Sequence, residues 1–156
     1  GLALKPGKPT IFGFGGPRKL PIFGLPGHPV SGLVVYRFLV RPALRVAGGE
    51  TLPGWEVPAA GLSGAADPPC RATARAATFG EPTLTARLTV SISSDQGRDE
   101  YLCVRLRPSP EGLEAEPVPG KSGLITMLAG ADGLVPIPAG ERGLERGSMV
   151  EVISLV

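Results

Sequence analysis

The apolar positions of this chain follow different periods in its two halves. Residues 10–14 and 20–25 are short runs rich in Ile and Phe, joined by the turn-forming sequence Gly15-Gly16-Pro17-Arg18. Two apolar runs on either side of a Gly-rich turn are typical of a β-hairpin. The composition of these runs predicts that the hairpin forms a buried edge of a sheet.

From Pro29 onward the period becomes that of an α-helix. Apolar side chains recur on one face, at Val30, Leu33, Val34, Phe38 and Leu44. Arginines recur every four residues on another face, at Arg37, Arg41 and Arg45. The pattern predicts an amphipathic helix, and we interpret the arginines as a solvated face in preference to an interaction patch. Pro42 is expected to bend the helix or start a second one, and Gly48-Gly49 to end it.

The second half of the chain has the period-2 alternation of β-strands. Residues 84–93 alternate cleanly, and residues 100–107, 112–118 and 149–156 are further strand-like runs. A short helix is expected within residues 122–131. Frequent Pro and Gly breaks between these runs favour a small barrel or a sandwich.

Residues 49–82 connect the two halves and are rich in Ala, Pro, Gly and Thr. This composition predicts a linker, in which residues 72–79 could form an edge strand. A length of 156 residues holds one ordinary domain or two small ones. Because the chain has no initiator Met and opens on a strand-like run at residues 1–4, we expect it to begin inside a fold, as a fragment or an excised domain.

Charge and cysteine content narrow the class of function. A net charge of +2, from 16 basic and 14 acidic residues, argues against non-specific binding of nucleic acid. Two cysteines and one histidine cannot supply a zinc site, and they suggest a reduced, intracellular setting. The longest apolar run, residues 32–40, is interrupted by Arg37 and is shorter than the roughly 20 residues of a membrane span. No secretory signal peptide is recognisable.

Two loops near the start of the chain could each hold an anion. The first is Lys5-Pro6-Gly7-Lys8-Pro9, where two ammonium groups lie on a backbone stiffened by proline. The second is Gly24-Leu25-Pro26-Gly27-His28-Pro29-Val30-Ser31, a strand-to-helix turn with proline at the expected first helical position. Helix N-termini carry unpaired N–H groups and the positive end of the helix dipole. Together the two loops predict an oxyanion or phosphoryl site.

Each candidate side chain also has an ordinary interpretation. Lys5 and Lys8 could be solvated lysines in a turn. His28 could be a helix cap, a solvent-facing turn residue or a ligand contact, and it is a poorer cap than Asn or Asp. Cys103 fits a small core residue better than a nucleophile. Residues 13–18 depart from a dinucleotide-binding fingerprint, and residues 115–122 depart from a phosphate-binding loop, where prolines remove N–H donors.

Several motifs occur in the order seen in one known family. They are Lys-Pro-Gly-Lys-Pro, Gly-Leu-Pro-Gly-x-Pro-Val-Ser, Gly97-Arg98-Asp99-Glu100-Tyr101, Gly120-Lys121-Ser122-Gly123 and the run from Leu128 to Pro138. In this order they resemble the C-terminal part of the MoeA family, the molybdopterin molybdenumtransferases, which includes the enzymatic domain of gephyrin. The resemblance implies an α/β fragment followed by a small all-β, barrel-like domain. The fragment would be the end of a MogA/MoaB-like molybdopterin-binding domain.

By this resemblance the chain divides into three parts. Residues 1–48 would be the C-terminal portion of the molybdopterin-binding domain, residues 49–82 a linker or insert, and residues 83–156 a C-terminal β-barrel like domain IV of MoeA. Complete family members carry a Ser-Gly-Gly-rich phosphate loop and magnesium-binding acidic residues upstream of the matched region. The isolated chain is therefore expected to be catalytically inactive or impaired.

The family inserts molybdate into adenylylated molybdopterin and releases AMP, with Mg²⁺ assisting, so these substrates and this cofactor are implied. The resemblance assigns to the ligand cleft the residues Lys5, Lys8, Pro26, Gly27, His28, Pro29 and Ser31. Arg98 and Ser122 match cleft-facing positions of the β domain. No metal ligand is expected in this chain. Family members usually carry Asn in place of His28 and Arg in place of Cys103.

The resemblance also implies a cytoplasmic homodimer, with molybdopterin adenylyltransferase as its partner in the pathway and neither nucleic acid nor membrane as a ligand. Truncation would leave sheet edges uncovered, so self-association through residues 1–48 is expected. The alternative is a non-catalytic module that binds an anion or a protein.

Overall fold

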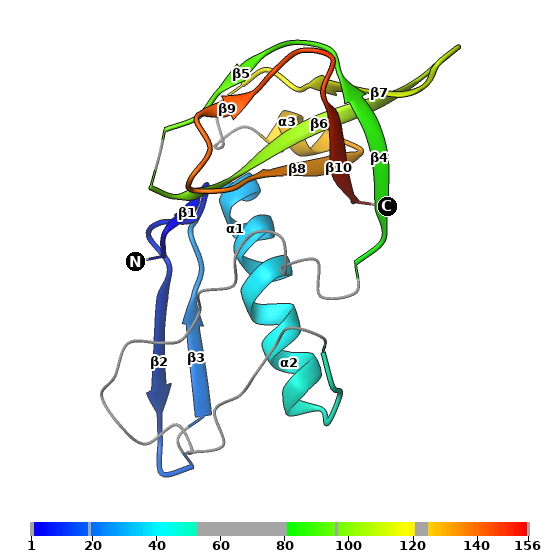
Figure 1. The fold of residues 1–156 in the computed structure, drawn as a ribbon. Helices are drawn as coiled ribbons and strands as arrows, with labels where there is room; N and C mark the ends of the chain where they lie inside the picture. The colour runs from blue at the N-terminus through cyan, green and yellow to red at the C-terminus, as the bar shows by residue number, and fades with distance from the viewer. Residues whose placement is uncertain (1, 19, 53–80, 96, 121–124, 156) are drawn as a thin grey trace.

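The second half of the chain is a closed β-barrel. The computed structural model describes residues 2–18, 20–52, 81–95, 97–120 and 125–155. The order around the barrel is β6-β7-β4-β10-β8, and β8 pairs back onto β6 to close it (Figure 1). Neighbours are antiparallel except the parallel pair β4 and β7. The five strands are β4 (Thr83–Leu88), β6 (Asp99–Ser109), β7 (Gly112–Pro117), β8 (Gly133–Ile137) and β10 (Met149–Ser154).

Alternation of side chains fills the barrel. One residue in two on each strand points inward, and the interior cluster consists of Ala86, Leu88, Val104, Ala115, Val135, Val150 and Val152. Except for Leu88 these residues are small or β-branched, which suits the narrow interior of a five-stranded barrel. The predicted all-β barrel is therefore confirmed. Because β8 pairs back onto β6, each of the five strands has a partner on both sides and no strand edge of the barrel is left open.

The run at residues 84–93 forms two strands instead of one. β4 ends at Leu88, and β5 (Ile92–Ser93) pairs with β9 (Gly143–Leu144) in a separate ribbon. The amide of Thr89 still donates to Ala115 O of β7 at 3.1 Å, and the chain changes partner after that residue. Alternation alone predicts one strand, since it does not record which partner each residue meets.

The predicted helix is present in three consecutive segments. α1 (Pro29–Val35) continues into the π-helical segment η1 (Tyr36–Val40) and then into α2 (Arg41–Ala47). Pro42 has no N–H to complete an α-helical bond, and the amide of Arg41 donates to Tyr36 O, five residues back. A proline thus widens the turn before it and starts α2. Gly48 caps the end, so both expectations for this helix are confirmed.

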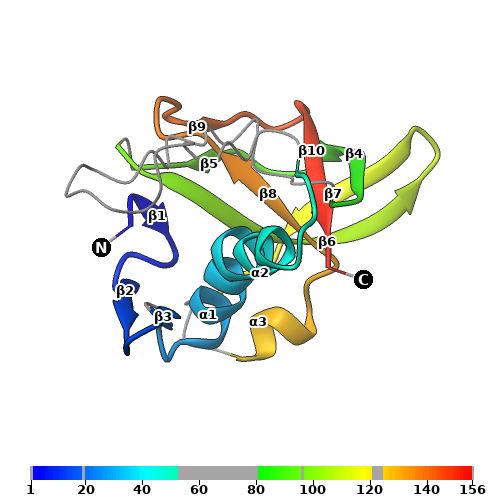
Figure 2. The same ribbon diagram turned by 90° about the horizontal axis from the view of Figure 1, so that it is seen from below.

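The first half of this helix packs against the outer wall of the barrel. Val30, Val34 and Phe38 join barrel residues in one buried cluster. The rings of Phe38 and Tyr101 stack with their centroids 4.3 Å apart. α3 (Ile125–Ala129), the short helix expected in this region, adds Met127 to the same cluster. Figure 2 shows the helix seen end-on beneath the barrel, while α2 projects away from it in Figure 1.

All three arginines on this helix pair with carboxylates, and the side chain of Arg37 is the least exposed, at 13%. Arg37 Nη2 lies 2.6 Å from Glu81 Oε2, and Arg41 Nη1 pairs with Glu81 Oε1. The Glu81 side chain is only 4% exposed. The solvated-face interpretation is therefore wrong for Arg37, because Glu81 folds onto it from 44 residues further along the chain. Arg41 also pairs with Glu81, but its side chain stays 43% exposed. Arg45 pairs with the exposed Glu50.

The predicted hairpin forms, but it is not buried. β2 (Ile11–Gly15) pairs antiparallel with β3 (Leu20–Gly24). Ile11 is 72% exposed, Leu20 60% and Ile22 57%. The prediction of a buried edge is wrong within this chain, since no other strand of the described residues pairs with either edge of the hairpin.

A short strand joins the N-terminal segment to the barrel. β1 (Leu4–Lys5) pairs in parallel with the start of β6, with Leu4 opposite Asp99 and Lys5 opposite Glu100. The amide of Asp99 donates to Ala3 O at 3.0 Å. The proposed edge strand at residues 72–79 lies outside the described residues. Among the described residues, none of the helices has the length and apolarity needed to cross a membrane.

Candidate functional site

The Lys5–Pro9 loop is held in one conformation by backbone contacts. The amide of Leu2 donates to Lys8 O at 3.1 Å, and the Thr10 hydroxyl donates to Gly7 O at 2.7 Å. Gly7 has φ +139° and lies against the helix, so that an added Cβ would sit 2.9 Å from Val35 Cγ2. Only glycine adopts this φ without strain. The loop is therefore a rigid element that rests on α1.

Lys5 is turned toward the barrel. Its Nζ lies 3.2 Å from Glu100 Oε1 and 3.3 Å from Asp95 Oδ2. The Ser94 hydroxyl donates to Glu100 Oε2 at 2.7 Å, which orients that carboxylate. Partial burial lowers the pKa of Lys5, but the hydrogen bonds and charges of Glu100 and Asp95 outweigh it, and the pKa is raised above 10.5. This ammonium is therefore charged and already paired.

Lys8 differs from Lys5 in its surroundings. It is exposed, and in the described part of the chain it makes no ion pair. Its loop touches the helix at Val35, while the second predicted loop lies at the helix start, Pro29. The two points are six residues apart, or about 9 Å along a helix axis. The structure thus places both loops on the same helix, beneath the barrel, but Lys5 is paired with carboxylates and Lys8 is exposed.

The turn before α1 has the backbone expected of a helix start. His28 is the N-cap residue in an extended conformation, its side chain makes no capping hydrogen bond, and Pro29 begins the helix. The amide of Gly32 donates to His28 O at 2.8 Å. The exposed residues here are Gly27 and His28, Pro26 and Pro29 are half-buried, and Ser31 is only 4% exposed. A ligand at this turn would meet backbone and imidazole before it met the Ser31 hydroxyl.

Arg98 lies at the barrel end of the same region. It immediately precedes Asp99, whose partner in the sheet is Leu4, so it lies at the joint between β1 and β6. Its side chain is half-buried. Ser122 lies outside the described residues. The structure therefore brings Lys5 and Arg98 to one edge, and the site predictions for all nine residues stay predictions.

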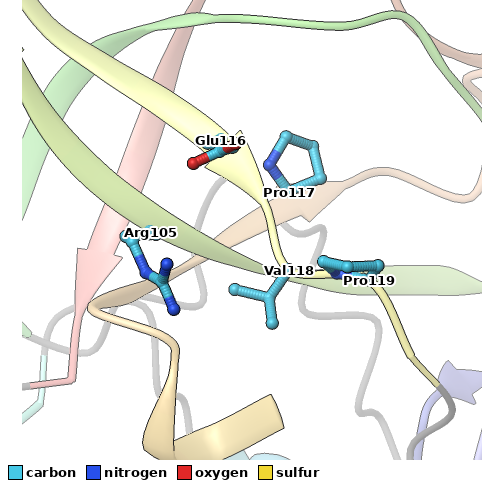
Figure 3. Close-up of a pocket in the computed structure, with 5 residues that line it drawn as sticks. All are labelled: Arg105, Glu116, Pro117, Val118 and Pro119. Atoms are coloured by element: carbon cyan, nitrogen blue, oxygen red, sulfur yellow. The ribbon is translucent and has the colours of Figure 1, made fainter.

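A small hollow lies beside the paired strands β6 and β7. It has a volume of about 80 Å³ and is lined by Arg105, Glu116, Pro117, Val118 and Pro119 (Figure 3). Arg105 Nε donates to Gly130 O at 3.1 Å, so this cation is already engaged. Pockets that enclose a cofactor-sized molecule are usually several hundred Å³, on the order of 300–1,000 Å³. The hollow is too small for a nucleotide and holds none of the predicted site residues.

The described residues do not fit a divalent metal ion. Within them, no group of three or more His, Cys, Asp or Glu side chains converges on one point. Mg²⁺ is usually held by carboxylate oxygens together with substrate phosphates. No step of a reaction is therefore assigned to Mg²⁺ in this part of the protein.

Sequence reasoning missed the acidic residues that organise the site. Glu100 lies within one of the motifs quoted above, yet its contact with Lys5 spans 95 residues of chain. Alternation places Glu100 beside Tyr101 on a strand but does not reveal which cation lies opposite. Glu81 was missed for the same reason. Burial of Cys103, at 2% exposure, raises the pKa of its thiol, which agrees with the core interpretation.

Comparison with known proteins agrees with this architecture. The MoeA C-terminal region (domain IV) family matches residues 85–155. Molybdopterin molybdenumtransferase 1 of Mycobacterium tuberculosis is 30% identical over 158 residues, 99% of this chain and 32% of that protein. Molybdopterin molybdenumtransferase of Synechocystis is 28% identical over 150 residues, 94% of this chain and 28% of that protein.

A solved structure extends the likeness to three dimensions. The molybdopterin biosynthesis moeA protein from Pyrococcus horikoshii superposes with a TM-score of 0.65 at 32% identity, covering 99% of this chain and 30% of that one. The chain spans about a third of the length of these relatives. The closed barrel, residues 85–155, is therefore a domain IV of the MoeA family, and nearly the whole chain is similar to molybdopterin molybdenumtransferases.

Proposed function

We propose that the protein acts in molybdenum cofactor biosynthesis, inserting molybdate into adenylylated molybdopterin with release of AMP. The observation that carries this proposal is the match to molybdopterin molybdenumtransferases along nearly the whole chain. A molybdenumtransferase must hold several anionic oxygens, those of phosphate and of molybdate. The rigid loop with the exposed Lys8 and the helix start at His28 are groups of the matching charge.

In this proposal the N-terminal segment is the end of a MogA/MoaB-like molybdopterin-binding domain. Residues 1–48 then form one wall of the ligand cleft, residues 49–82 connect it to the barrel, and residues 83–156 form the β domain. Lys8 and backbone N–H groups at the start of α1 would bind phosphate or molybdate oxygens, and Arg98 and Ser122 would approach from the β domain. A cytoplasmic homodimer supplied by molybdopterin adenylyltransferase, with Mg²⁺ held by residues outside this chain, completes the proposal.

The test uses the parent protein, supplied with molybdate, Mg²⁺ and adenylylated molybdopterin. AMP release measured by chromatography is the expected result. Lys8→Ala should lower the rate by about tenfold, as removal of a charged hydrogen-bond donor does. Arg18→Ala is the matched control, since it removes one exposed positive charge at the far turn of the hairpin. A correctly folded parent that releases no AMP contradicts the proposed activity and favours a non-catalytic binding module.

A further inference from the structure

We propose that Glu100, oriented by Ser94, is a positioning residue: it anchors the Lys5–Pro9 loop to the barrel through Lys5 and leaves Lys8 as the cation offered to an anion. This inference rests on the proposed function, which places an anionic substrate at the loop. It assigns different roles to two lysines that the sequence treats alike.

The Glu100 carboxylate is fully used by protein partners. Its Oε1 lies 3.2 Å from Lys5 Nζ, and its Oε2 lies 3.3 Å from the same ammonium and 2.7 Å from the Ser94 hydroxyl. The side chain is 18% exposed, whereas the carboxylate of the surface pair Arg87–Glu111 is 74% exposed. A partly buried carboxylate with three short contacts has one orientation, unlike a mobile surface ion pair.

Backbone hydrogen bonds connect the Lys5–Glu100 pair to the rest of the loop. Lys5 and Glu100 are paired in register between β1 and β6, next to the bond from the Asp99 amide to Ala3 O. Beyond Lys5 the loop closes on itself, since the Leu2 amide donates to Lys8 O and the Thr10 amide donates to Gly7 O. A change in the position of Lys5 therefore moves the whole loop, including Lys8.

Charge argues that Lys5 itself does not receive the anion. Two carboxylates, Glu100 and Asp95, lie within 3.3 Å of its ammonium, and Asp95 is 77% exposed. An anion that approached Lys5 would meet two negative charges for one positive charge. Lys8 has no such neighbour among the described residues, so attraction dominates there.

Amide hydrogen exchange on the 156-residue chain tests the anchor. Glu100→Gln should accelerate exchange at the amides of Leu2, Thr10 and Asp99 by about fivefold, the effect of losing one charged hydrogen-bonded pair. The barrel amide of Val118, which donates to Cys103 O at 2.9 Å, should keep its rate and so exclude global unfolding. Glu111→Gln is the matched control and should change none of these rates.

A charge swap separates positioning from a merely structural effect of the substitution. Lys5→Glu combined with Glu100→Lys restores the pair with its charges reversed and should return exchange toward the wild-type rates. Titration with AMP, followed by calorimetry, then tests whether Lys8 is the cation that binds the anion. Lys8→Ala should weaken AMP binding by about tenfold without changing exchange, and Glu100→Gln should weaken it by about threefold while exchange rises.

Three outcomes overturn the inference. They are unchanged exchange in Glu100→Gln, no recovery in the charge-swapped protein, and unchanged AMP affinity in Lys8→Ala. A wild-type chain that binds no AMP counts against the anion site of the proposed function and against the role of Lys8. The exchange rates still decide whether Glu100 anchors the loop, so the two failures are distinguishable.

Discussion

At the scale of single residues, the most consequential contacts are ion pairs between distant parts of the chain. Glu81 has a nearly buried carboxylate, and both of its oxygens pair with arginines of the helix, Arg37 and Arg41. Removal of one partner from a buried ion pair leaves an uncompensated charge, which is costlier than the pair itself is stabilising. Glu81 therefore fastens the chain just before β4 to the helix.

Glu81→Gln should lower the free energy of unfolding by about 2 kcal/mol, because two arginines lose their shared carboxylate while Arg41 keeps partial access to water. Urea denaturation measures the difference. The surface substitution Glu111→Gln is its control and should change stability by no more than about 0.5 kcal/mol. Equal changes in the free energy of unfolding for the two substitutions would show that the buried ion pairs of Glu81 do not stabilise the fold more than a surface pair does.

The ion pairs of Lys5 should make the free energy of unfolding depend on pH in the alkaline range. Burial lowers the pKa of Lys5 in the folded protein, but the hydrogen bonds and charges of Glu100 and then of Asp95 together outweigh burial, so the pKa is raised. A raised pKa contributes stability that is fully present below the unfolded value of about 10.5 and is lost as pH rises through the folded value. The difference in unfolding free energy between wild type and Lys5→Met should thus be constant below pH 10 and shrink above it, to be measured by urea denaturation at several pH values. A difference that grew above pH 10 would contradict this assignment.

At the scale of elements, the helix and the barrel share one buried cluster. Val30, Val34 and Phe38 of the helix meet Tyr101 and Cys103 of β6. These two β6 residues alternate with inward-facing neighbours, so the strand serves two cores at once, one inside the barrel and one against the helix. The helix is consequently held by packing, and its ion pairs lie further along, toward α2.

Phe38→Ala should destabilise the chain by about 3 kcal/mol, since it removes a buried ring stacked on Tyr101 and leaves a cavity. Thermal or urea unfolding gives the value. Leu44→Ala, on the exposed side of α2 at 57% exposure, is the control and should cost less than about 1 kcal/mol. If the two substitutions were equivalent, the helix would not depend on the barrel for its position.

The contact between Gly7 and the helix predicts that Gly7→Ala and Gly16→Ala differ in their effect on stability. Gly7→Ala should destabilise by about 2 kcal/mol, because φ is +139° and the new Cβ would lie 2.9 Å from Val35 Cγ2. Gly16→Ala, with φ +71° and nothing within 4 Å of the added Cβ, carries backbone strain alone and should cost about 1 kcal/mol. Urea denaturation compares them, and a smaller effect at Gly7 would show that the loop does not rest on the helix.

At the scale of the whole molecule, an exposed apolar hairpin projects beside the helix, away from the barrel (Figure 1). Phe12 is 49% exposed and Phe14 43%, in addition to Ile11, Leu20 and Ile22. A two-stranded hairpin is marginally stable without a covering layer. Its free edges and apolar faces can therefore pair with other chains.

We predict that the 156-residue chain self-associates through this hairpin. Light scattering at increasing concentration should show species larger than a monomer. Ile22→Thr should reduce association, because it removes apolar surface that is 57% exposed, whereas Leu84→Thr on the barrel, 43% exposed in the wild type, should not. A monodisperse monomer at high concentration would contradict the prediction.

The sequence by itself determined most of the elements and the all-β class of the second half. Alternation in the second half, the helical period after Pro29, and the Gly-rich turn at residues 15–18 are local signals, and each produced strands, a helix or a turn as predicted, except that residues 84–93 form two strands. The ordered motifs determined the family as well. Such signals are readable because period and turn chemistry depend on neighbouring residues alone.

Only the tertiary structure decided which side chains are exposed and which charges meet. The hairpin is apolar but uncovered, Arg37 and Arg41 are polar but paired, and the two lysines of one motif have opposite surroundings. Burial and ion pairing depend on what approaches from elsewhere in the chain, as Glu81 does for the helix and Glu100 for Lys5. These contacts join residues 44 and 95 positions apart, and no local pattern encodes a separation of that length.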